Sequence, residues 1–291
     1  MRPLLLLIAV VCLSLPALLI RGARAPIEAI GFWRLALACA VLAPWAWTRR
    51  GTMTAPVARS IAAAGTLFFL HLWTFTWAVS HTSVAHLMLA FSTHPVWTGL
   101  GAWLFFQEPL GRRELGAFAL AAAGVVVLFG GSIGAGGAGL AGDLSALLSA
   151  MFFSAWVLAG RRVRRGLDTV SFLFAAYATA ALLFFATGAA KGGAWSGWPP
   201  STWAALAALA FAVSLGGHGL FTYLLNTYGV LALSCAKLVE PVLAALGAFW
   251  LFGEPLSPRL GAAFALIATG VVVLLRSPRG RPRTREDLAE G

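Results

Sequence analysis

Long apolar runs separated by short polar segments occupy nearly the whole chain. A helix that crosses a lipid bilayer needs about 20 mainly apolar residues. Applying this length predicts ten membrane-spanning helices, near residues 4–20, 27–48, 58–80, 83–106, 114–131, 141–160, 169–190, 202–226, 229–252 and 259–275. The acidic residues agree with these spans, because all but Glu240 lie at or near the ends of apolar runs or in the C-terminal tail. The pattern therefore predicts an all-α, polytopic membrane protein.

The chain also repeats itself. When it is shifted by 146 residues without a gap, residues 84–128 match residues 230–274 at many positions, including Pro95 with Pro241, Gly101 with Gly247, Glu108 with Glu254, Pro109 with Pro255 and Gly124 with Gly270. We therefore predict a first five-helix unit at 1–131, a Gly-rich connector at 132–140, a second unit at 141–276 and a basic tail at 277–291. Because five is an odd number of spans, the second unit must enter the membrane from the opposite side. Such inverted repeats are a recurring property of secondary transporters.

Composition and charge support a membrane location. Hydrophobic residues make up 60% of the chain and charged residues 11%, whereas soluble domains have about 25% charged residues. The net charge of +11 does not indicate nucleic-acid binding, because the basic residues concentrate in alternate short loops and in the tail. Cytoplasmic loops carry an excess of Lys and Arg, so we expect both termini to be cytoplasmic, in the plasma or bacterial inner membrane. The tail also suits contact with anionic lipid.

Several motifs resemble a known family. They are the two related segments 101–110 and 247–256, each ending in Glu-Pro-Leu, the Gly142-Asp143-Leu144 start of the sixth span, and Phe32-Trp33-Arg34 in the second span. On these residues the chain resembles the drug/metabolite transporter superfamily, in its ten-helix EamA-type branch. The first span lacks the Trp-Gly pair that is common there. The resemblance implies export of amino acids or related metabolites along a path between the two halves.

Glu240 is the sharpest candidate for chemistry, because a carboxylate at bilayer depth is costly and suggests function. It precedes Pro241, and its repeat counterpart is His94, which precedes Pro95. A proline removes a backbone donor and loosens the helix, so Pro95 and Pro241 are candidate hinges. Glu240 could bind a substrate amine or a proton. Alternatively it forms a structural pair with Lys237, three residues earlier on the same helix face.

Other polar residues within spans are candidates for the lining of a central cavity. On the third and fourth spans they are His71, Trp77, His86, His94 and Trp97, and on the eighth and ninth they are His218, Tyr223, Lys237 and Glu240. Each histidine could equally serve as a hydrogen-bonding contact between helices. Arg34 could extend to the membrane interface or to Glu28, or it could hold a substrate carboxylate. Glu108 and Glu254 lie at span ends, where helix capping is a sufficient role.

These features favour a secondary transporter of small metabolites that works by alternating access. Imidazole and aromatic groups suit amino acids, aromatic ones among them, or related amphipathic metabolites. A phosphate-binding loop of the form GxxxxGK[ST] is missing from the sequence, so the energy must come from a substrate or proton gradient or from a separate ATPase. An intramembrane enzyme is a weaker alternative, since the sequence has neither HExxH nor paired aspartates and no metal or cofactor is expected. A non-transporting scaffold or receptor is a further alternative. Membrane lipid and a small-molecule substrate are the expected partners.

Overall fold

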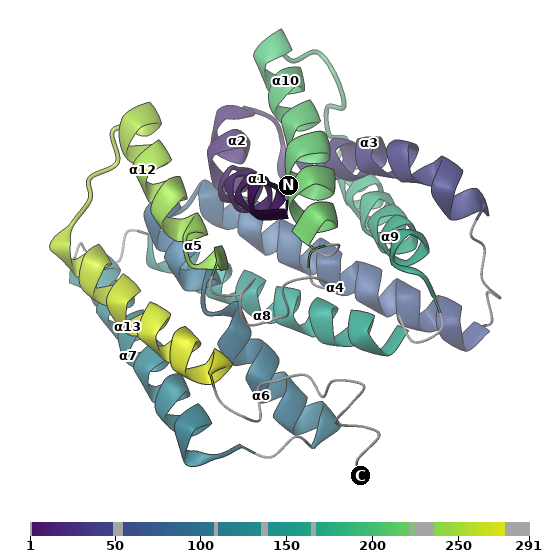
Figure 1. Cartoon of the computed structure of the whole chain (residues 1–291). Helices are drawn as coiled ribbons and strands as arrows, with labels where there is room; N and C mark the ends of the chain where they lie inside the picture. Colours follow the sequence, from purple (N-terminus) through teal and green to yellow (C-terminus); the bar gives the residue numbers. More distant parts are fainter. Residues whose placement is uncertain are drawn as a thin grey trace.

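The computed structural model describes residues 2–48, 55–107, 110–134, 139–163, 167–221, 224 and 236–276. All secondary structure in these residues is helical (Figure 1). The first repeat comprises α1 (Arg2–Ser14), α2 (Pro16–Gly22), α3 (Ile27–Thr48), α4 (Ala55–Val79), α5 (Val84–Phe91), α6 (His94–Phe106) and α7 (Arg112–Gly134). The second comprises α8 (Leu140–Val163), α9 (Thr169–Ala190), α10 (Pro200–Ala208), the π-helix η1 (Leu209–Gly219), α12 (Glu240–Phe252) and α13 (Pro258–Leu275).

Ten membrane-spanning helices in two inverted five-helix repeats make up the fold, as the sequence predicts. Eight helical segments of the described chain are long and apolar enough to cross a bilayer. The fourth span is divided between α5 and α6, and α12 is the described part of the ninth. Large apolar side chains such as Trp250 and Phe105 are exposed on the outer surface of the bundle, where lipid is their natural solvent.

The predicted continuous fourth span is instead two helices, and the break recurs in the ninth span. Turn residues Ser92 and Thr93 separate α5 from α6, and their counterparts Leu238 and Val239 form a turn just before α12. Both α6 and α12 begin at the residue before a proline, and both end in a left-handed residue, Gln107 and Gly253. All these positions differ by 146, so the repeat seen in the sequence is also a repeat of backbone conformation.

Two other spans are less regular than predicted. The first divides at Leu15 into α1 and α2, because Pro16 at the start of α2 lacks the N–H that would continue the ladder of α1. The eighth span changes from α-helix to π-helix at Leu209; the π-helix ends at Gly219, and residues 220–221 are again helical. The last part of the predicted span, residues 225–226, lies outside the described residues.

The pseudo-two-fold relation is clearest where α7 crosses α13, the neighbouring helices at one edge of the bundle in Figure 1. An added Cβ on Gly124 would lie 3.0 Å from the carbonyl oxygen of Ala263, and one on Gly270 would lie 2.6 Å from that of Ala117. Ala117 and Ala263 are themselves 146 residues apart. Each glycine therefore permits the same close backbone approach to the opposite repeat.

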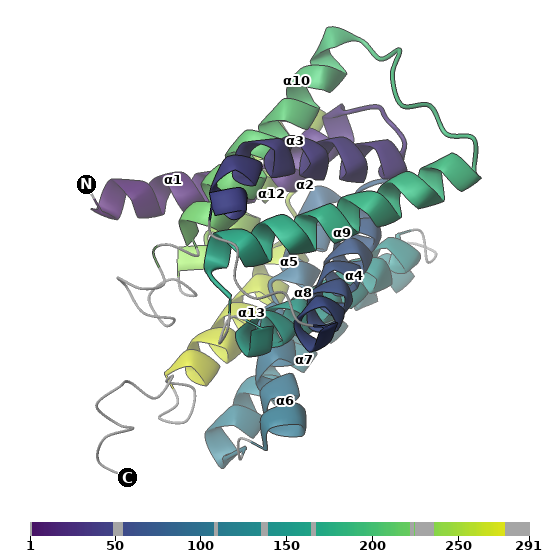
Figure 2. The same ribbon diagram turned by 90° about the vertical axis from the view of Figure 1, so that its right-hand side faces the viewer.

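Other helix pairs follow the same exchange. Because α1 and α8 are repeat counterparts, as are α4 and the span that contains η1, the packing of α4 on α8 corresponds to that of η1 on α1. In the same way, the packing of α6 on α8 corresponds to that of α12 on α1. The pair of α3 with α9 maps onto itself. In Figures 1 and 2, α6 and α10 lie toward opposite ends of the molecule, with α5, α8 and α12 between them. The centre of the bundle is thus built from the broken helices of both repeats.

Candidate functional site

Two adjoining pockets lie where the broken helices meet. The first is lined by residues of α5, α6 and α12 and by the turn before α12, including Met88, His94, Pro95, Glu240 and Pro241. The second shares Met88, Phe91, Lys237 and Glu240 with the first, and adds Arg34, His71 and His218. Their volumes are about 10 and 20 Å³, which is room for one or two water molecules. The pockets are narrow, and their lining includes ionisable side chains from both repeats.

Lys237, just before the turn that precedes α12, and Glu240, the first residue of α12, line both pockets. Lys237 Nζ lies 3.8 Å from Glu240 Oε1, and the side chains are 8% and 5% exposed. The ammonium also lies over the rings of Phe153 and Phe221, 5.2 and 5.1 Å from their centroids. Glu240 Oε1 has no hydrogen-bond partner among the described residues. The ion pair is therefore present, but at 3.8 Å it does not satisfy Oε1, which can still accept a hydrogen bond inside the bundle.

His71 and His94 approach the centre from the first repeat. His71 Nδ1 lies 2.8 Å from Ser149 Oγ, and that hydroxyl donates to the His71 carbonyl at 3.1 Å. His71 thus lines a pocket and also joins α4 to α8. The His94 ring lies between Phe91 and Phe153, and its Nδ1 has no hydrogen-bond partner among the described residues. His94 and Glu240, counterparts in the repeat, both line the first pocket.

His218 and Arg34 reach the second pocket from η1 and α3. Arg34 is 3% exposed, and its Nε donates to Ser214 Oγ at 2.9 Å. The expected extension of Arg34 toward the interface or Glu28 is wrong, because Glu28 instead pairs with Lys191 at 2.7 Å. The guanidinium is directed into the bundle, where it can act on a ligand.

Three sequence candidates do not join this centre. Trp77 stacks on His81, with ring centroids 3.6 Å apart. The Trp97 indole N–H donates to Thr93 Oγ1 at 3.1 Å. His86 lies at the start of α5, bonded to Asp143, and none of these three lines either pocket. Tyr223 lies outside the described residues.

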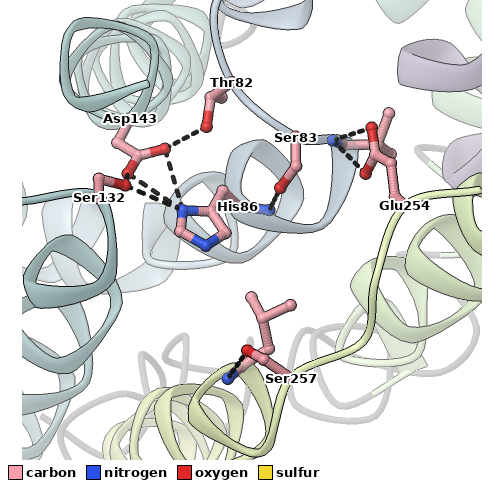
Figure 3. Close-up of polar contacts among 9 residues, drawn as sticks. Thr82, Ser83, His86, Ser132, Asp143, Glu254 and Ser257 are labelled. Carbon is pink, nitrogen blue, oxygen red and sulfur yellow. Dashed lines mark hydrogen bonds and ion pairs between the residues drawn. The ribbon is translucent and has the colours of Figure 1, made fainter. Parts of the chain in front are cut away.

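His86 belongs to a second polar cluster, at the end of the bundle where α4 connects to α5 (Figure 3). Asp143 at the start of α8 is fully buried. Its carboxylate accepts from Thr82 Oγ1 at 2.5 Å, lies 3.1 Å from His86 Nδ1 and also accepts from Ser132 Oγ. These donors compensate the cost of burying a carboxylate. Gly142 allows the approach, since a Cβ there would lie 2.5 Å from the His81 carbonyl oxygen.

Glu254 of the second repeat makes further polar contacts at the same end of the bundle. Its carboxylate accepts from the Val84 N–H at 2.9 and 3.1 Å and forms an ion pair with Arg21 at the end of α2. Arg21 also donates to the carbonyl of Thr82 at 2.9 Å. Glu254 therefore caps a helix, as expected, but that helix is α5 of the first repeat. The helix that follows Glu254, α13, is capped by Ser257. Glu108, the counterpart of Glu254, lies outside the described residues.

Sequence reasoning did not include Met88 and Phe91 among the lining residues, and it gave Arg34 a substrate-holding role only as the alternative to an interfacial one. Met88 and Phe91 carry no polar signal, so only their position beside the helix break could indicate them. Arg34 had a signal, namely a cation seven residues inside an apolar span. Within the described chain, no group of three or more His, Cys, Asp or Glu is placed to hold a metal ion.

Comparisons with known proteins agree with this architecture. The sequence model of the EamA-like transporter family matches residues 2–130 and again residues 140–276. No curated protein matches this sequence. Among solved structures, the chain is similar to a protein of known crystal structure, with 21% identity over 94% of this chain and 95% of that one and a TM-score of 0.65; at this identity the likeness concerns the fold. Because the family matches both repeats and nearly the whole chain, this protein belongs to the EamA-like transporter family.

Proposed function

We propose that this transporter exports amino acids or related amphipathic metabolites by alternating access, in a plasma or bacterial inner membrane with both termini cytoplasmic. The observation that carries the proposal is the pair of polar pockets at the symmetric helix breaks, where His94 and Glu240 face a common space. Discontinuous helices with polar groups near the bilayer midplane are the usual form of a transporter binding site.

The chemistry of the pockets suits a zwitterion. Glu240 offers an oxygen that can accept from an ammonium group, and Arg34 and Lys237 offer cationic donors. Phe91 stacks with the imidazoles of both His71 and His94, and this aromatic group would contact an apolar or aromatic side chain of the cargo. A proton carried by Glu240 or by a histidine is the alternative way of coupling transport to a gradient.

The narrowness of the pockets requires movement for transport. An amino acid needs more space than one or two water molecules, so the broken helices must separate for cargo to enter. The cluster around Asp143 and Glu254 joins α2, α5 and α8 at one end of the bundle. In the proposed orientation this end faces away from the cytoplasm, and its contacts would break when the protein opens there.

Flux measurements test the proposal. The purified chain is reconstituted in liposomes loaded with unlabelled amino acids, and uptake of labelled amino acids is followed by counterflow across a broad panel. We expect saturable exchange of at least one member of the panel. Exchange that is no faster than in protein-free liposomes for every member would reject the proposal and favour a scaffold or receptor.

A further inference from the structure

Arg34 is a buried cation for which the described residues supply no ion-pair partner. Its one hydrogen bond to the described residues runs from Nε to Ser214 Oγ, while a guanidinium carries five N–H donors. The Ser214 hydroxyl in turn donates to the Leu209 carbonyl at 3.1 Å, so this partner is neutral. No hydrogen bond joins the two terminal amino groups of Arg34 to the described residues.

The carboxylates of the described chain are engaged elsewhere. Glu28 pairs with Lys191, Asp143 with His86, and Glu254 with Arg21. Glu114 accepts from the Gly111 N–H, and Asp168 caps α9. Glu240 is the remaining carboxylate, and its charged neighbour is Lys237. None of these carboxylates forms an ion pair with Arg34.

Among the described residues, the lining of the second pocket therefore contains two cations, Arg34 and Lys237, and one carboxylate, Glu240. A charge buried in a low-dielectric interior is costly unless an opposite charge compensates it. An anionic group on a ligand in this pocket would supply the missing charge. The guanidinium suits this role because its planar fork matches both oxygens of a carboxylate.

We infer that Arg34 binds the carboxylate of the cargo, so that the substrate class is a small molecule with a free carboxylate, and that Glu240 receives the amino group where the cargo has one. This inference rests on the proposed function and specifies which end of the cargo each repeat recognises. Arg34 belongs to the first repeat and Glu240 to the second. Cargo bound in this way would link the two repeats through its own two charges.

Wild-type protein provides the first test. Counterflow of labelled L-phenylalanine and L-leucine is measured in proteoliposomes, with competition by the parent acids, by their amides and methyl esters, and by 3-phenylpropionate. We expect the amides and esters, which lack the carboxylate, to compete at least about tenfold more weakly than the parent acids. 3-Phenylpropionate keeps the carboxylate and should still compete. If amides and acids compete equally while flux is saturable, the inference is overturned and the proposed function stands.

Variants of Arg34 provide the second test. Arg34→Gln should remove the preference for acids over amides, whereas Arg34→Lys should keep part of it. Ser214→Ala is the matched control, because it removes the hydrogen bond to Arg34 and keeps the charge; it should retain the preference. Survival of the preference in Arg34→Gln would overturn the inference. Loss of the preference in Ser214→Ala would overturn it as well. If Arg34→Gln fails to fold, the wild-type competition and Arg34→Lys decide. Absence of flux of every panel member in wild type rejects the proposed function, and the inference with it.

Discussion

At the scale of single residues, the interior of this transporter holds few charges, and each faces a specific neighbour. Glu240 is 4% exposed and is placed at the start of α12 by the turn before Pro241. One of its oxygens faces Lys237 and has no hydrogen bond among the described residues. A structural pair alone would be expected to satisfy both partners more fully. The geometry thus favours a role for Glu240 in binding, in addition to its ion pair.

Glu240→Gln tests this role. The amide keeps the size of the side chain and removes its charge, so we expect saturable flux to fall about tenfold or more while expression and detergent-solubilised folding persist. Flux in proteoliposomes and size-exclusion profiles measure the two effects. Glu28→Gln is the control, because it removes a carboxylate that pairs with Lys191 away from the pockets. Unchanged flux in Glu240→Gln would remove this residue from the mechanism.

At the scale of helices, two kinds of contact join the repeats. The crossing of α7 and α13 is a close backbone approach that depends on Gly124 and Gly270. The other contact is polar, from the loop before α13 to α5, and depends on Glu254. Small residues permit close packing of membrane helices, whereas a hydrogen-bonded ion pair can break and re-form during a transport cycle. We therefore expect the α7–α13 crossing to persist throughout the transport cycle and the Glu254 contact to break and re-form.

Gly270→Ala tests the constant contact. The new Cβ would lie 2.6 Å from the Ala117 carbonyl oxygen, so α13 must move away from α7 at a cost of about 1–3 kcal/mol. We expect a lower melting temperature in detergent. Gly261→Ala on the same helix is the control, since no atom lies within 4 Å of its added Cβ; alanine should be neutral or stabilising there. Equal melting temperatures for the two variants would contradict the crossing.

Glu254→Gln tests the changing contact. Loss of the charge breaks the ion pair with Arg21 and weakens the bonds to the Val84 N–H, which should shift the protein toward the form that is open at this end. A cysteine at Met88, which lines both pockets, reports the shift in a background without native cysteines. We expect its labelling by a maleimide applied from this side to accelerate about tenfold, equivalent to ~1.4 kcal/mol. An unchanged rate would show that the contact does not control access.

At the scale of the whole molecule, helix contacts between the two repeats recur with the roles of the first and second repeat exchanged. His94 and Glu240 meet at the centre, and α6 and α12 leave it as equivalent helices. Two halves of similar structure can exchange their conformations at little cost in free energy, which is the physical basis of alternating access. The pockets between them would then open to each side in turn.

The inverted arrangement predicts the location of two loops. Cysteines at Gln107 and Leu256, after α6 and α12, should be labelled by an impermeant maleimide from opposite sides of the membrane. Inside-out and right-side-out vesicles distinguish the two sides. The proposed orientation places Gln107 in the cytoplasm. Labelling of both positions from the same side would exclude the inverted relation.

The number of spans and the repeat were readable from the sequence alone, because span length, apolar content and the recurrence of Glu-Pro-Leu and of proline are local features of the chain. The meeting of Arg34, His71, His94 and Glu240 was decided by the tertiary structure. The direction of a side chain depends on the rotation of its helix against its neighbours, which a uniformly apolar sequence scarcely encodes. His86 and His94 illustrate the difference: a regular helix would place them on one stripe, but the break at Ser92 and Thr93 directs His94 to the centre and leaves His86 with Asp143.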